Sequence, residues 1–201
     1  MRKTDKTRRA AAILERLKAR YPVPETMLTH ENPWELMIAT VLAAQCTDAR
    51  VNTITPELFR RWPGPAEMMQ ATQEEIESVI RPTGFYHNKA KNIIACCKKI
   101  LSDFNGEIPD NMEDMLSLAG VGRKTANLIL GDIYGKPAIV TDTHCIRICG
   151  RLGFYDESLK DPTKVEKIMA EIVEPCEQSD FCHRIVQFGR DTCSARSPAC
   201  G

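Results

Sequence analysis

Apolar side chains recur at helical spacing along most of the chain, and no segment has a convincing strand pattern. Residues 9–20 place their apolar side chains on one face of a predicted amphipathic helix, which Pro22 and Pro24 follow. Asn32 and Pro33 are typical of a helix start, and residues 34–44 are apolar almost all round. A helix of that composition belongs in the core.

Capping residues and glycines divide the remainder into further helices. Thr72 with Glu75, and Asp110 with Glu113, match the capping-box pattern. The predicted helices run about from residues 47 or 48 to 59, 72 to 80, 88 to 104, 110 to 118, 123 to 134, 143 to 152, 162 to 173 and 181 to 188. Only residues 136–144 look extended, so the pattern predicts an all-α protein.

Composition adds little to this picture. The chain has 201 residues, of which 43% are hydrophobic, and its 27 basic side chains balance 27 acidic ones. Global charge therefore gives no argument for nucleic acid, although residues 1–20 hold eight basic and two acidic side chains. We expect no membrane segment or signal peptide, and a cytoplasmic, nucleoid-associated protein. Five of the nine cysteines fall in apolar helical patterns, which predicts that they are reduced packing residues: Cys46, Cys96, Cys97, Cys145 and Cys149.

The most informative segment is residues 116–126, where a helix runs into Gly120 and Gly122 and a second helix begins at once. Glycine lets another molecule approach the backbone, and the N–H groups at a helix start favour an anion. A Walker loop would need glycine directly before Lys124, where Arg123 stands, and a dinucleotide loop would need a third glycine after a strand. The remaining interpretation is a pair of helices joined by a Gly-x-Gly hairpin that binds an anion. The alternative is a tight turn between two helices with a solvated lysine and no ligand.

Two reactive groups flank this hairpin. Lys124 lies in the first turn of the second helix, where Arg123 and the helix dipole favour its neutral, nucleophilic amine. Asp142 follows on another element and could face the lysine, activate it and stabilise a cationic sugar transition state. An aspartate alone at this place is more often a helix cap.

Residues 118–127 followed by 140–144 resemble the helix-hairpin-helix, Gly/Pro-rich loop and Asp signature of DNA glycosylases, and more narrowly the endonuclease III family. Residues 44–48 and 84–90 resemble further family segments in the same order, so the resemblance spans nearly the whole chain. It implies a two-lobed fold, with a six-helix barrel domain at 26–136 and a second helical domain from 1–25 and 137–201. The resemblance implies that Lys124 and Asp142 meet across the cleft between these lobes.

The resemblance also implies a role for each site residue. Lys124 would attack the sugar C1′ of a flipped-out nucleotide, expel the base and form an imine, after which β-elimination breaks the strand. Asp142 would activate Lys124 and stabilise the developing charge. The implied DNA contacts are Gln45, Phe85, Gly120, Gly122, Arg123 and His144.

Some of these positions have a structural alternative or depart from the family. Gln45 could satisfy backbone groups at the edge of the core, and His144 could be a packed histidine in the helix. Phe85 replaces the leucine associated with the family wedge, and a buried turn aromatic is its alternative. Ala119 replaces a proline common in the hairpin.

Cys193 and Cys200, six residues apart, match the first two of four cysteine ligands of the family's [4Fe–4S] cluster. The third and fourth ligand positions fall beyond Gly201, so either the sequence is part of a longer protein or this form lacks the cluster. No catalytic metal is expected, and Cys176, Cys182 and His183 match no metal spacing.

Three functions remain open on the sequence. The first is a monomeric bifunctional DNA glycosylase and abasic-site lyase that removes oxidised pyrimidines from duplex DNA. The second is removal of adenine from mispairs, although that relative lacks a lysine at the position of Lys124. The third is a non-catalytic helix-hairpin-helix DNA-binding module.

Overall fold

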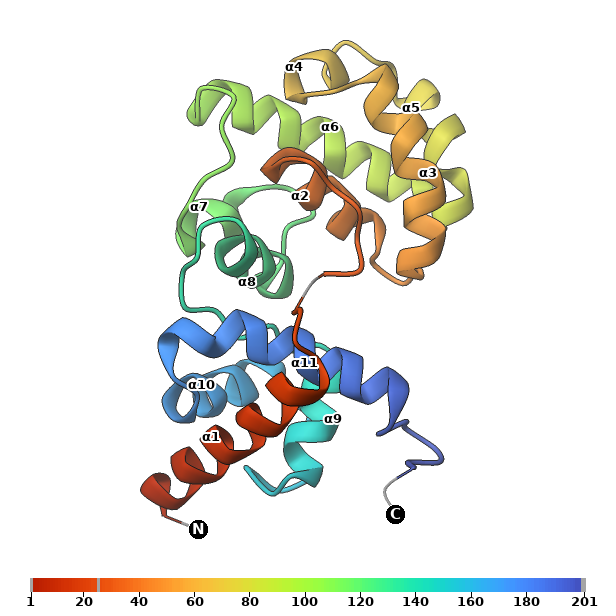
Figure 1. The fold of residues 1–201 in the computed structure, drawn as a ribbon. Helices are drawn as coiled ribbons and strands as arrows, with labels where there is room; N and C mark the ends of the chain where they lie inside the picture. Colours follow the sequence, from red (N-terminus) through yellow and green to blue (C-terminus); the bar gives the residue numbers. More distant parts are fainter. Residues whose placement is uncertain (1, 25, 200–201) are drawn as a thin grey trace. The chain divides into compact units, whose positions relative to one another are not determined.

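The computed structural model describes residues 2–24 and 26–199, and their regular structure is entirely helical. The α-helices, drawn in Figure 1, are α1 (Lys3–Arg20), α2 (Pro33–Leu42), α3 (Asp48–Arg61), α4 (Pro65–Met68), α5 (Gln73–Ile80), α6 (Tyr86–Asp103), α7 (Met112–Ser117), α8 (Arg123–Asp132), α9 (Thr143–Arg151), α10 (Pro162–Ile172) and α11 (Gln178–Asp191). Two 3₁₀-helices, η1 (Arg81–Thr83) and η2 (Pro175–Glu177), precede α6 and α11. The all-α prediction is confirmed.

Side-chain caps define several helix starts. Asn32 accepts a hydrogen bond from the Glu35 N–H, and Thr72 with Glu75 forms the predicted capping box. The box predicted at Asp110 and Glu113 is wrong by one residue, because Asn111 takes the extended N-cap conformation and accepts from the Asp114 N–H at 3.0 Å.

Several helices exceed their predicted lengths. Helix α1 begins at Lys3 rather than Arg9, α6 begins at Tyr86, and α11 runs from Gln178 to Asp191. Much of the added sequence is polar, and it carries no clear apolar stripe by which periodicity could have found it.

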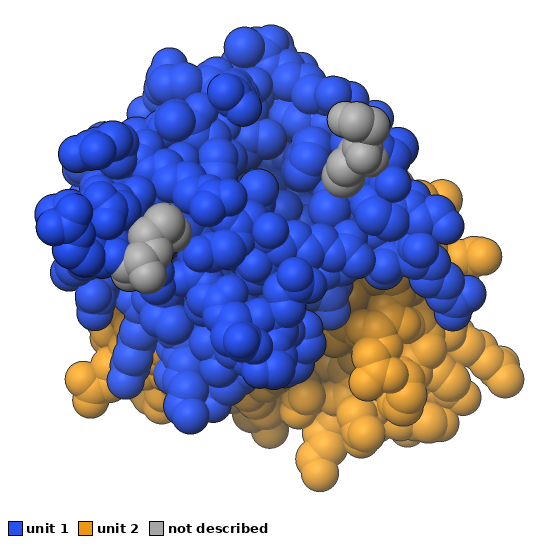
Figure 2. Space-filling model, turned by 90° about the horizontal axis from the view of Figure 1, so that it is seen from below, with its two compact units in different colours: residues 1–26, 130–201 blue, residues 27–129 orange. Residues whose placement is uncertain are grey.

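The chain divides into two compact units, coloured separately in Figure 2. Unit 1 comprises residues 1–26 and 130–201, and unit 2 comprises residues 27–129. The second boundary lies within α8, between Ile129 and Leu130, whereas the sequence placed it at Lys136.

Unit 2 is built around α6. This helix packs against α5, α4 and α2, and α3 packs against both α2 and α5. Leu36, Met37, Ile38 and Leu42 of α2 are completely buried, as expected for a helix that is apolar on nearly every face.

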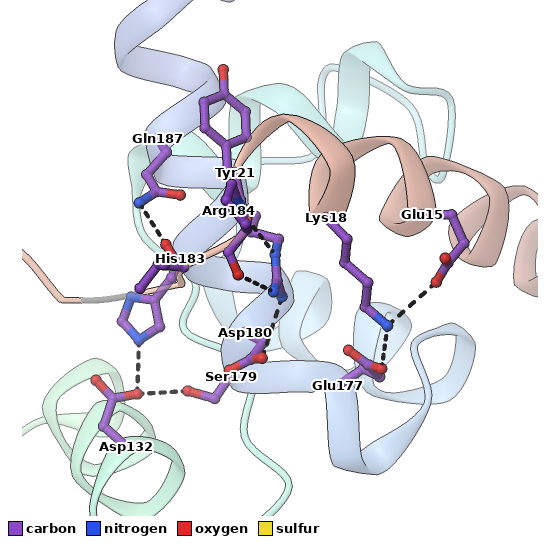
Figure 3. A network of polar contacts seen from close by, with 12 residues as sticks. Glu15, Lys18, Tyr21, Asp132, Glu177, Ser179, Asp180, His183, Arg184 and Gln187 are labelled. Atoms are coloured by element: carbon purple, nitrogen blue, oxygen red, sulfur yellow. Dashed lines mark hydrogen bonds and ion pairs between the residues drawn. The ribbon is translucent and has the colours of Figure 1, made fainter.

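Unit 1 joins the two ends of the chain. Helix α1 packs on α10 and α11, and α9 packs on α11 (Figure 1). Polar contacts reinforce the packing of α1: Lys18 Nζ lies 2.5 Å from Glu177 Oε1, and the buried Arg184 donates from Nε to the Tyr21 backbone oxygen at 3.0 Å (Figure 3). These contacts connect residues more than 150 positions apart and hold the N-terminal helix in place.

Burial explains the abundance of cysteine. Cys96, Cys97, Cys145 and Cys149 are free and buried, which confirms their prediction as packing residues, and Cys182 is free and buried as well. Burial raises the pKa of Cys96 and of Cys97 to about 12, so both remain thiols at neutral pH. Cys46 differs from the prediction, since it lies half-buried in the turn after α2 rather than in a helix.

None of the helices in the described part of the chain is long and apolar enough to cross a membrane.

Candidate functional site

The Gly-x-Gly segment forms a tight turn between α7 and α8. Leu118 ends α7 in an extended conformation, and Gly120 follows with φ +80°, which only glycine adopts without strain. A Cβ atom at Gly120 would also lie 3.0 Å from the Asn92 Cβ atom. Gly122 directly precedes α8, and its carbonyl oxygen accepts the hydrogen bond of the Ala126 N–H at 2.9 Å.

The turn exposes hydrogen-bond donors at the start of α8. Gly120 and Gly122 are exposed, and within residues 2–24 and 26–199 neither N–H has an acceptor. Because the positive end of the helix dipole lies at the same place, the geometry suits an anion such as a backbone phosphate.

Alanine substitutions at the two glycines should have different effects on stability. At Gly120, a positive φ and the contact with Asn92 predict that alanine lowers the free energy of unfolding by about 1–2 kcal/mol. At Gly122 the added Cβ meets nothing within 4 Å, so alanine should change stability by less than about 0.5 kcal/mol. Urea unfolding of both variants measures the difference. Equal decreases in the free energy of unfolding would contradict this account of the turn.

Lys124 lies one residue into α8 and is exposed, as is Arg123. The amine is thus in the first turn of the helix that begins at the two unpaired glycine amides. An exposed amine and two unpaired backbone N–H groups therefore share one short segment of unit 2.

Asp142 has the cap geometry that its position suggested. Its Oδ1 accepts the Cys145 N–H at 2.7 Å, and its Oδ2 lies 3.2 Å from His144 Nδ1. The carboxylate side chain is 15% exposed and the imidazole 25% exposed. The cap fixes one oxygen of Asp142 and leaves the group partly accessible, so a structural and a chemical role are compatible.

His144 is held by close packing in unit 1. Its ring lies so near Gly189 of α11 that a Cβ there would be 2.5 Å from the His144 Cδ2. Glycine at 189 therefore allows α9 and α11 to approach and places the imidazole beside Asp142.

Gln45 and Phe85 share an unusual backbone conformation. They have φ values of +54° and +50°, in the left-handed region that L-residues seldom occupy. Gln45 is exposed in the turn after α2, and Phe85 is 63% exposed at the start of α6. The alternative of a buried turn aromatic is therefore wrong for Phe85, and Gln45 is not part of the core. Strained, exposed side chains of this kind cluster at binding sites.

The predicted site residues divide between the two units. Unit 2 contains Gln45, Phe85, Gly120, Gly122, Arg123 and Lys124, and unit 1 contains Asp142, His144 and Cys193. Within unit 2, the hairpin brings Gly120, Gly122 and Lys124 together, and within unit 1 Asp142 contacts His144. Cys200 lies outside the described residues.

Cys193 is buried against α9. Arg151 donates to its Sγ at 3.3 Å and to the Ser194 oxygen at 2.8 Å, and Arg147 donates to the Cys193 oxygen at 2.9 Å. Neither arginine was predicted to contact this segment, although their i, i+4 spacing places them on one helix face. No group of three or more His, Cys, Asp or Glu side chains in residues 2–24 and 26–199 could hold a metal ion.

Comparison with known proteins gives one consistent family. Residues 38–175 match the model of the HhH-GPD superfamily of base excision DNA repair proteins. The chain is 43% identical to endonuclease III of Synechocystis sp. over 197 residues, which cover 98% of this chain and 89% of the relative. It is 40% identical to endonuclease III of Escherichia coli K12, over 94% of this chain and 89% of the relative.

Solved structures lead to the same group. A trapped covalent intermediate of endonuclease III with DNA superposes with a TM-score of 0.90 at 39% identity, over 98% of this chain and 91% of that one. A thermostable thymine-DNA glycosylase has the same fold, with a TM-score of 0.83 at 18% identity over 96% of this chain and 91% of that one.

Proposed function

Because the chain belongs to the endonuclease III family of HhH-GPD base excision repair proteins, we propose that it is a bifunctional enzyme that excises oxidised pyrimidines and cleaves abasic sites. Its class as a base excision repair DNA glycosylase follows from the family. The proposal of a bifunctional enzyme rests on the start of α8, where two exposed, unpaired glycine amides precede the exposed amine of Lys124.

Lys124 is the proposed nucleophile. Its Nζ forms a bond to the sugar C1′ while the C1′–N bond breaks, and the base leaves with the electron pair and takes up a proton. Ring opening gives an imine between Nζ and C1′. Loss of a C2′ proton then breaks the C3′–O bond and releases the 3′ phosphate, so strand cleavage follows base loss on the same amine.

Asp142 is the proposed base and electrostatic partner in this reaction. As a carboxylate it can take a proton from the Lys124 ammonium, and its charge stabilises the oxocarbenium character of the sugar as the base departs. The hydrogen bond from the Cys145 N–H to Oδ1 fixes the orientation of the group, and Oδ2 faces His144.

The proposed DNA contacts come from the family resemblance, and the exposure of several of these residues supports them. The amides of Gly120 and Gly122, with Arg123 nearby, suit a backbone phosphate and read no sequence. C1′ is inaccessible inside a duplex, so the damaged nucleotide must leave the stack. We propose, as the family resemblance implies, that Gln45 and Phe85 enter the gap and that His144 supports the damaged strand.

A [4Fe–4S] cluster is normal in the endonuclease III family, but the described residues do not supply its ligand set. Cys193 is the one family ligand among them, and a cubane cluster requires four. No step of the proposed chemistry involves a cluster.

Duplex DNA is the proposed partner, since related endonuclease III structures contain DNA. We also propose that the protein acts as a monomer at a damaged or abasic site in the nucleoid.

Duplexes with different single lesions test the proposed substrate class. We expect strand cleavage at thymine glycol and at abasic sites, no cleavage of undamaged duplex, and no excision of adenine opposite 8-oxoguanine. Gel analysis of end-labelled strands, with and without alkali, separates base loss from β-elimination. Adenine excision, or binding without any product, would favour one of the two other functions.

A further inference from the structure

A buried lysine connects the two turns that carry Gln45 and Phe85. Lys89 of α6 is 5% exposed, and its Nζ donates to the backbone oxygens of Leu42 at 2.8 Å and Thr83 at 2.9 Å. All five residues belong to unit 2, where α2 and α6 pack together (Figure 1). A single ammonium group therefore binds both turns.

The two carbonyl groups lie a short way before the strained residues, three positions before Gln45 and two before Phe85. Leu42 is the last residue of α2, and Gln45 follows in the adjoining turn. Thr83 is the last residue of η1, and Phe85 lies two positions further on. A left-handed conformation at a non-glycine residue persists only where the surrounding structure fixes it. The hydrogen bonds of Lys89 fix the backbone at the entry to each turn.

The surroundings of Lys89 also argue for a role beyond core packing. Burial lowers its pKa, an effect that Cys46 partly opposes, and no carboxylate of residues 2–24 and 26–199 pairs with it. The C-terminal end of α2 carries the negative end of its helix dipole, which favours the ammonium form. An apolar side chain would fill the same core position without the cost of burying a charge.

We propose that Lys89 is a positioning residue that holds the Gln45 and Phe85 turns as one preorganised element for the gap left by an extruded nucleotide. This role rests on the function proposed above. With both turns already ordered, DNA binding does not have to immobilise them, which increases affinity for a gapped stack. Lys89 contacts neither DNA nor the reacting atoms, so it acts on recognition rather than on the amine chemistry.

Lys89→Met tests this role because it keeps the length of the side chain and removes the donors. We expect its affinity for a duplex containing a tetrahydrofuran abasic analogue to fall about 10- to 100-fold, with little change for undamaged duplex. KM for abasic DNA should rise, whereas kcat for strand cleavage should stay within about twofold. Lys98→Met, at an exposed position of the same helix, is the matched control and should behave as wild type.

A double-mutant cycle distinguishes positioning from general stability. In a Gln45→Ala, Phe85→Ala background, Lys89→Met should cost little further affinity, because the side chains it positions are gone. The fluorescence of 2-aminopurine opposite the abasic analogue reports entry into the gap and should fall with Lys89→Met. If Lys89→Met does not fold, Lys89→Gln, which keeps a shorter donor, replaces it in the same comparison.

The outcomes separate the two proposals. A wild type that prefers the abasic analogue, with a Lys89→Met variant that retains this preference, would overturn the role of Lys89 alone. The role of Lys89 would also be overturned if Lys89→Met lost equal affinity for damaged and undamaged DNA. The same holds if Lys89→Met lost its full share of affinity again in the Gln45→Ala, Phe85→Ala background. A wild type with no preference for the analogue would overturn the proposed function as well.

Discussion

Lys124→Ala should abolish strand cleavage at abasic sites while leaving DNA binding largely intact. Without the amine there is no imine, and the β-elimination that depends on it is lost, so the rate should fall by roughly 1,000-fold or more. Lys124 is an exposed residue in the first turn of α8, and alanine favours a helix, so the fold should be unaffected.

Single-turnover cleavage of an abasic duplex and fluorescence anisotropy of the same duplex measure the two effects separately. Lys98→Ala, which removes an exposed lysine from α6, is the control for loss of charge and should cleave as wild type. Cleavage by Lys124→Ala within tenfold of wild type would show that another group is the nucleophile.

Asp142→Asn should reduce base excision by about 100-fold or more while the protein stays folded. Asparagine keeps an Oδ1 acceptor for the Cys145 N–H and caps a helix about as well as aspartate, so this substitution removes charge and leaves the cap. The lost charge is the one proposed to accept a proton from Lys124 and to stabilise the sugar cation.

The measurement is single-turnover excision from a thymine glycol duplex, with binding and thermal unfolding measured in parallel. An unchanged melting temperature with slow excision supports a chemical role for Asp142. A variant with wild-type excision would leave Asp142 as a helix cap alone. Asp161→Asn is the matched control, since Asp161 caps α10 in the same manner and has no proposed role in the chemistry.

The elements with strong local signals were predictable from the sequence. Three sequence patterns each have one dominant structural interpretation, and the structure contains all of them: Asn32 before Pro33, the Thr72 capping box and the apolar α2. Helix starts without such a signal were missed: α1 begins in a charged segment, and Asn111 rather than Asp110 caps α7.

The site was predictable where chemistry and spacing coincide along the chain. Gly120, Gly122 and Lys124 belong to one local motif, and the cap at Asp142 follows from the short segment before α9. The proposed role of Lys89 was not predictable from the sequence, because its two acceptors lie 47 and 6 positions away and are backbone atoms. The one available signal was a lysine four residues before Ile93, on the apolar face of α6.

The contacts of two arginines with the Cys193 segment were also not predictable, because they are long-range. Nothing in the local sequence distinguishes Arg147 and Arg151 from other charged residues, yet they donate to backbone oxygens and to the sulfur of a segment more than 40 positions away. Only the folded packing of α9 on α11 brings them together.

Borohydride trapping on abasic DNA tests the central proposal most directly, because it records the covalent bond itself. We predict that the wild-type protein forms a stable adduct with an abasic duplex in the presence of borohydride, and that mass spectrometry of the digested adduct locates the sugar on the peptide containing Lys124. No adduct, or an adduct on a different lysine, would contradict the assignment of Lys124 as the group that attacks the sugar.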